Sequence, residues 1–296
     1  MQDENPLQGR RCRRTARTVT ILPSTLRFEP LYSRTARHDR HTLYQATFNR
    51  QKAGRLEYFQ LFFSDNTFTL LGQNTNQYAA SKNAGSGGKR SWKPTSIPEM
   101  KIFFSLIIYM EVFPSAQVKD YWSHDSEFPF HRIGMYLSQN RFKQLKRYFH
   151  VSEHYDPGSL PQSCWYFKVA PRADLLQAHY QQYFLPSSDI AVDEMMVRFT
   201  GRSAHTILLR GKPTPQGYKI LALCDYGYTY SFIFTSRTNC FAELNSNLYS
   251  GQAKLRPTSQ AVDQLASSLP SQLFSFTIYM DNYFSNICLF HALRER

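Results

Sequence analysis

At 296 residues the chain can bury a large hydrophobic core, and its formal net charge of +13 predicts a polyanionic partner. Its longest apolar run, residues 102–110, is far shorter than the about 20 residues of a membrane span, so nucleic acid is favoured over a membrane. The five cysteines are odd in number and widely spaced, which indicates a reducing compartment and excludes a zinc finger within this chain.

Residues 1–55 are rich in arginine and show little hydrophobic periodicity. We expect a disordered basic arm that screens DNA phosphates or serves import into the nucleus; a solvated tail without a role is the alternative. His38 and His41 in this arm are not expected to bind a metal, because no cysteine or further histidine accompanies them.

Residues 56–187 show helical periodicity and are predicted to form a helical support domain. Ser96, followed by Pro98 and Glu99, is a helix-start signature with a capping box, and Pro114 is expected to end that helix. Helical patterns also cover residues 56–71 with a break at 64–66, residues 138–149, and residues 171–184.

Cations accompany two of these segments. The loop 81–93 combines glycines with lysines and arginine, and it either contacts DNA or is a plain surface connector. The cations of the helix 138–149 serve either solubility or DNA contact.

The helix 171–184 is expected to turn one row of side chains inward: Leu175, Leu176, His179, Tyr180 and Tyr183.

At residue 190 the spacing of apolar residues changes from a helical to a strand-like period. Strands are predicted over residues 190–199, 206–210, 218–224, 228–235 and 274–280, with a helix at 257–269 and a closing helix from about 285. Short turns between the first strands imply antiparallel pairing, whereas the helix before the last strand allows it to run parallel to the first. This order is the layout of a ribonuclease-H-like sheet.

Asp193 and Asp281 are carboxylates within short β-prone apolar runs, where aspartate is disfavoured. If the last strand lies beside the first, the two acids converge into a divalent-metal site suited to phosphodiester chemistry. The alternatives are a strand-edge acid that balances nearby arginines, and a turn or capping residue. Glu194 alternates to the opposite face of the strand, and Asp225 is read as a turn residue.

A basic segment follows the first of these acids. Between residues 195 and 224 there is no aspartate or glutamate, which suits a surface that holds a phosphate backbone over metal-binding carboxylates. The candidate DNA-binding residues are Arg198, Arg202, Arg210, Lys212 and Lys219.

Several segments resemble the piggyBac family of DNA transposases and the host proteins derived from them. The segment 190–202 resembles the family's first-aspartate segment, and Lys212-Pro213 with Gly217-Tyr218-Lys219 resembles the stretch after it. Residues 279–285 are similar to the second-aspartate segment. Upstream, the resemblance covers the family's helical region in three stretches: 75–79, 120–123 and 141–150.

The resemblance implies an α+β or α/β protein in which a helical dimerisation and DNA-binding domain, residues 56–187, precedes a partial ribonuclease-H-like mixed sheet with flanking helices, residues 188–296. It implies that Asp193 and Asp281 are the first two ligands of a Mg²⁺ pair that cleaves and joins DNA at TTAA sites. The expected partners are double-stranded DNA and a second copy of the chain, with no membrane and no small-molecule substrate.

The family's third aspartate lies downstream of the helix that begins near Ser285 and has no counterpart before Arg296. Its insertion domain and cysteine-rich C-terminal module are likewise absent. We therefore expect a truncated or decayed copy, or a fragmentary gene model. Three functions stay open: a piggyBac-like transposase or its remnant, a non-catalytic DNA-binding or dimerisation protein, and an ordinary ribonuclease-H-like nuclease.

Overall fold

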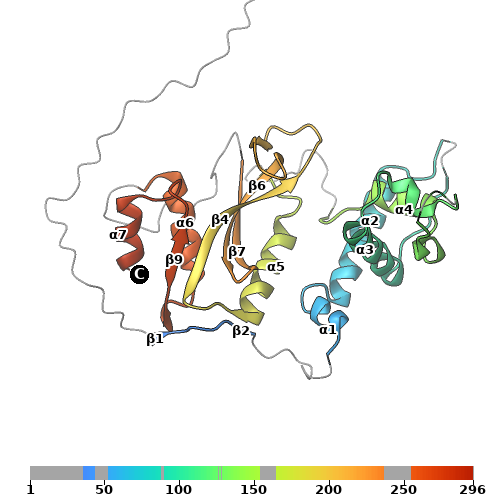
Figure 1. Ribbon diagram of the computed structural model, residues 1–296. Helices are drawn as coiled ribbons and strands as arrows, with labels where there is room; N and C mark the ends of the chain where they lie inside the picture. The colour runs from blue at the N-terminus through green and yellow to red at the C-terminus, as the bar shows by residue number, and fades with distance from the viewer. Residues whose placement is uncertain are drawn as a thin grey trace, which may run out of the picture.

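The computed structural model describes residues 36–43, 53–87, 90–125, 127, 129–153, 165–236 and 255–295. Helices dominate its first half and a mixed sheet with flanking helices its second, as Figure 1 shows. The predicted mixed helix-and-sheet class is therefore confirmed. No helix in these described ranges combines the length and the hydrophobicity that crossing a membrane requires.

The helical region is built around one aromatic core. Its helices are α1 (Arg55–Gln60), α2 (Asp65–Ser81), α3 (Ile97–Val112) and α4 (Gln139–Tyr148), with the 3₁₀ turns η1 (Val118–Trp122) and η2 (Arg132–Met135) between the last two. Ser64 and Ser138 cap α2 and α4, each accepting a hydrogen bond from the backbone three residues on. The buried side chains come from every one of these helices except α1: Phe68, Leu71, Met100, Phe103, Leu106, Tyr121, Ile133, Phe142 and Leu145.

The capping box expected at α3 does not form. Ser96 stands at the N-cap without a side-chain hydrogen bond, and Glu99 instead accepts two hydrogen bonds from Arg141, at 2.8 and 2.7 Å. The guanidinium of Arg141 lies 4.6 Å from the ring centre of Trp92. A charged, two-pronged donor outcompetes a neutral backbone amide for a carboxylate, so the tertiary partner replaces the local one.

The sheet of the second half has three long strands and two short edge strands. β4 (Asp189–Arg198) pairs antiparallel with β6 (Gln216–Asp225), whose other edge pairs with β7 (Tyr228–Thr235) and with β5 (Ile207–Leu208). β9 (Thr277–Met280) pairs with the free edge of β4 and runs parallel to it. The predicted meander and the predicted parallel return strand are both present.

Helices cover both faces of this sheet (Figure 1). α6 (Pro257–Ser267) and α7 (Ile287–Glu295) bury the apolar residues of one face. These residues form a second core, separate from the core of α1–α4. α5 (Ala170–Tyr183) lies against β7, where Gln177 accepts a hydrogen bond from the backbone of Phe232 at 2.7 Å. Of the α5 residues expected to point inward, Leu175 is 40% exposed, because the helix packs on the sheet through Gln177 and Tyr180.

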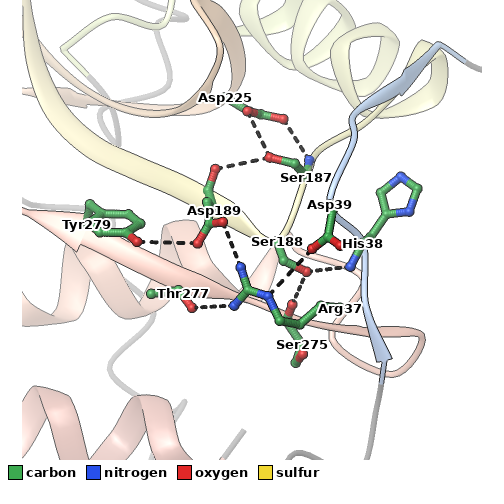
Figure 2. Close-up of polar contacts among 10 residues, drawn as sticks. All are labelled: Arg37, His38, Asp39, Ser187, Ser188, Asp189, Asp225, Ser275, Thr277 and Tyr279. Atoms are coloured by element: carbon green, nitrogen blue, oxygen red, sulfur yellow. Dashed lines mark hydrogen bonds and ion pairs between the residues drawn. The ribbon is translucent and has the colours of Figure 1, made fainter.

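Part of the expected basic arm is ordered. β1 (Ala36–Arg37) pairs with β8 (Phe274–Ser275), and β2 (Thr42–Leu43) pairs with β3 (Phe184–Leu185). Arg37 contacts Asp189 at 2.6 Å, and Ser188 exchanges hydrogen bonds with the backbone of His38, as Figure 2 shows. The expectation of an unstructured arm is thus wrong for residues 36–43, because they find backbone partners in β8 and β3. The remaining residues of the arm lie outside the described ranges.

Candidate functional site

Asp193 lies in β4, and Asp281 directly follows β9, the parallel neighbour of β4. The register of β4 and β9 places Asp189 opposite Thr277 and Val192 opposite Met280. Asp193 is the next residue of β4, and Asp281 directly follows the last residue of β9. Neighbouring strands in a sheet lie about 4.8 Å apart, so the register brings two backbone positions that are far apart in sequence near each other.

Asp193 lies on the face of the sheet opposite the core, and the side chains of β9 alternate in the same way. Along β4, Ile190 and Val192 are buried in the core under α6 and α7, while Asp189 and Asp193 alternate to the exposed face. On β9 the same alternation applies, because the hydroxyl of Tyr279 donates to Asp189 at 3.4 Å (Figure 2). Asp281 lies two residues beyond Tyr279, directly after β9, and is exposed.

The carboxylates are held by backbone amides. The amide of Glu194 donates to Oδ1 of Asp193 at 2.7 Å, and the amide of Tyr283 donates to Oδ1 of Asp281 at 3.3 Å. Both side chains are exposed, and none of the ion pairs found among the described residues neutralises either of them. Two like charges at adjacent positions repel, and a cation between them relieves that repulsion.

The donor set suits one hard cation better than two. Mg²⁺ typically uses one or two carboxylates and completes its six oxygens with water and substrate phosphates, which two exposed aspartates allow. The described part of the chain contains no cluster of three or more histidine, cysteine, aspartate or glutamate side chains around a metal position. The residues present therefore fit a single hydrated divalent ion.

Asp225 is not the simple turn residue that the sequence suggested. It is buried, and its carboxylate accepts hydrogen bonds from the backbone amide of Ser187 at 2.6 Å and from its hydroxyl at 3.1 Å (Figure 2). This carboxylate ties the start of β4 to the end of β6. No sequence signal separates it from a turn aspartate, because its partner is 38 residues away.

Cys224 is a neighbour of the site that sequence analysis did not single out. Burial raises the pKa of its thiol, and the negative charge of Asp193 raises that pKa further. The pKa of the Cys224 thiol therefore depends in part on the negative charge of Asp193.

Four of the five predicted DNA-binding cations are exposed. Arg198 ends β4, and the others occupy the segments around β5: Arg202, Arg210 and Lys212. None of them takes part in an ion pair with another described residue. These four residues, called here the basic rim, are available to a polyanion.

Lys219 differs from the basic rim. It is 9% exposed, its ammonium contacts Oε1 of Glu194 at 2.7 Å, and the ring centre of Tyr283 lies 4.8 Å away. Glu194 lies on the opposite face from Asp193, as the alternation predicts. Because its charge is buried and paired, Lys219 is not presented to a ligand, and the assignment of this residue to DNA binding does not fit its position.

Comparison with known proteins identifies the family. A family model described as Transposase IS4 matches residues 55–296. Human PiggyBac transposable element-derived protein 2 is 23% identical over 239 residues, 80% of this chain and 38% of that protein. Human PiggyBac transposable element-derived protein 5 is 28% identical over 145 residues, 49% of this chain and 27% of that protein. The chain belongs to the piggyBac transposase family.

A solved piggyBac structure has the same fold. The cryo-EM structure of a piggyBac transposase synaptic complex with hairpin DNA superimposes with a TM-score of 0.65 at 22% identity, covering 79% of this chain and 47% of that one. The chain thus spans less than half the length of the piggyBac relatives named here. The resemblance noted from short segments of the sequence is confirmed at the level of family and fold.

Proposed function

We propose that this chain carries the core of a piggyBac-type DNA transposase, in which Asp193 and Asp281 bind one divalent cation, Mg²⁺, at the phosphodiester to be cleaved. The observation that supports the proposal is the parallel register of β4 and β9, which pairs Val192 with Met280, the residues directly before two exposed aspartates. An acid pair in that position has no packing role, and the sheet around it supplies a rigid support.

The cation, when bound, activates the attacking oxygen and stabilises the leaving oxygen. The carboxylates of Asp193 and Asp281 hold it, and the backbone amides of Glu194 and Tyr283 orient one oxygen of each carboxylate, which leaves the second oxygen for the ion. Exposure of both acids lets a DNA backbone approach them directly.

The basic rim positions the DNA in this proposal. Arg198 lies five residues along β4 from Asp193, about 17 Å at the rise of a strand. That distance corresponds to roughly five base pairs of a duplex, so cleavage at the acids and phosphate contacts at the rim fall on one DNA segment. The proposal includes a location in the nucleus and a homodimer, since the substrate is chromosomal DNA with two transposon ends.

The test is Mg²⁺-dependent nicking of a duplex that contains TTAA. Wild-type protein is expected to nick, and Asp193→Asn and Asp281→Asn are expected to abolish nicking while leaving DNA affinity nearly unchanged. The matched control is Asp174→Asn, which removes an exposed carboxylate from α5 and is expected to nick like wild type. Equal activity in all four proteins would show that the acid pair is not the site.

A second function is favoured by the basic rim, whose four exposed cations form no ion pair with another described residue. In that case the chain binds DNA without cutting it. The distinguishing result is salt-sensitive DNA binding with no nicking. Replacing the four rim cations by glutamine is then expected to reduce the slope of log affinity against log salt by about 0.9 for each phosphate that the variant no longer neutralises.

A further inference from the structure

We propose that Glu194, Lys219 and Tyr283 form a positioning unit that holds Asp281 beside Asp193 and so sets the affinity of the acid pair for a divalent cation. The inference deepens the proposed function and rests on it, since it assumes that the acid pair binds a cation. It gives Lys219 a role other than the DNA contact expected from its charge.

The unit joins three separate segments of the sheet. Lys219 comes from the middle of β6, Glu194 from β4, and Tyr283 from the turn after β9. The ammonium of Lys219 contacts Glu194 at 2.7 Å and lies 4.8 Å from the ring centre of Tyr283. One cation on the central strand therefore fastens the two segments that carry the aspartates.

The same two residues that Lys219 holds by their side chains also hold the aspartates by their backbones. The amide of Glu194 donates to Asp193, and the amide of Tyr283 donates to Asp281. A shift of Tyr283 therefore moves the hydrogen bond that orients the Asp281 carboxylate. The coupling is direct, because a single residue lies between Asp281 and Tyr283.

Stability alone explains this unit poorly. The side chains of Lys219 and Glu194 are only 11% and 16% exposed, and a buried ion pair contributes little net stability compared with apolar residues of the same size. Tyr283 is 57% exposed, so it buries little apolar surface. What the unit supplies is geometric: it fixes the turn 281–283 relative to β4 across the middle of the sheet.

The turn has few other constraints of this kind. The backbone amide of Phe284 donates to the carbonyl of Asp281, and Ser285 donates to the same carbonyl at 3.3 Å, which shapes the turn internally. Phe284 is buried in the core under α6 and α7 and anchors the C-terminal side of the turn. Tyr283 links the turn to β6 through its contact with the ammonium of Lys219.

The experiment measures Mn²⁺ affinity, with Mn²⁺ as a probe for Mg²⁺, in parallel with thermal unfolding. Tyr283→Ala and Lys219→Met are expected to weaken Mn²⁺ binding about tenfold, the lower end of the effect of residues that orient metal ligands. Tyr283→Phe retains the ring over the ammonium and is expected to restore wild-type affinity. Because Tyr283 is exposed, Tyr283→Ala keeps the proposal testable even if Lys219→Met fails to fold.

The matched control is Arg141→Met, which removes the cation from the similar group of Glu99, Arg141 and Trp92 in the helical region. It is expected to lower the unfolding temperature without changing Mn²⁺ affinity. Wild-type affinity in Tyr283→Ala would overturn the positioning role while leaving the proposed function intact. Equal Mn²⁺ binding by wild type and Asp193→Asn would instead overturn the proposed function itself, and the positioning unit with it.

Discussion

The helical region and the sheet each contain a carboxylate, a cation and an aromatic ring in contact. In the helical region Glu99 binds Arg141, which stacks near Trp92; in the sheet Glu194 binds Lys219, which lies near Tyr283. The composition is alike, but only the second group adjoins the acid pair. The same three kinds of side chain therefore serve different purposes, depending on the segments that they join.

The cations of the two groups differ in how tightly they fix their partners. Arg141 makes two hydrogen bonds to Glu99 and a third to the carbonyl of Lys93, so it holds α3, α4 and the chain before α3 in one orientation. Lys219 makes one short contact with Glu194, and its ammonium lies 4.8 Å from the ring centre of Tyr283. A planar guanidinium makes several hydrogen bonds in fixed directions, whereas an ammonium acts as a compact point charge.

Core truncation in each region gives the largest expected effect and tests whether the regions are separate. Phe103→Ala in the helical core is expected to cost about 3–5 kcal/mol, and Leu221→Ala in the sheet about 2–5 kcal/mol, because each leaves a cavity. Hydrogen exchange is the measurement: amides of α2–α4 lose protection in the first variant and amides of β4–β7 in the second. Simultaneous loss in both regions would mean that they unfold as one unit.

Removing the carboxylate of the helical group gives the next largest effect. Glu99→Gln is expected to cost about 1.5 kcal/mol, the lower end for hydrogen bonds to a charged group. Burial of Glu99 raises its pKa, but the hydrogen bonds and the charge of Arg141 outweigh burial, so the pKa lies below its ordinary value of 4.5. The carboxylate therefore stabilises the fold above pH 4.5, and this contribution is lost as the pH falls through the lowered folded-state pKa.

The corresponding measurement is the free energy of unfolding between pH 3 and pH 6. Wild type is expected to lose stability more steeply than Glu99→Gln as the medium becomes acidic, so the two curves converge at low pH. Parallel curves would mean that Glu99 is not linked to acid unfolding.

Much of this architecture could be predicted from periodicity and turn residues. The change from helical to strand period at residue 190, and the helix before the last strand, were enough to predict a meander with a parallel return strand. Asp193 and Asp281 were found because aspartate is disfavoured inside a strand, so an acid there indicates a function. Their role in metal binding stays a prediction.

Other features depended on register and burial, which the sequence does not contain. Lys219 looked like its cationic neighbours, yet the pairing of β4 with β6 sets it diagonally from Glu194 and under the turn after β9. The position of Glu99 in the sequence predicted a capping box, but its carboxylate accepts hydrogen bonds from Arg141, 42 residues away. Asp225 and Arg37 likewise meet partners that only the assembled sheet provides.

The smallest expected effect is a change in the pKa of Cys224, in the sheet. The charge of Asp193 contributes to the raised pKa of Cys224, so Asp193→Asn is expected to lower that pKa. In a variant whose other four cysteines are replaced by serine, the rate of alkylation against pH measures the shift. Glu99→Gln is the control and is expected to leave the curve unchanged. Saturating Mn²⁺ should imitate Asp193→Asn, and a curve that does not respond to Mn²⁺ would argue against a cation at Asp193.

The contact of β1 with the sheet has a consequence for biosynthesis. Arg37 and its hydrogen-bond partner Thr277 are 240 positions apart. A ribosome adding about 5–20 residues per second delivers the second of these residues on the order of 10 to 50 s after the first. Throughout that interval residues 36 and 37 have no strand to pair with. The attachment of this early segment therefore has to wait until β8 has been synthesised.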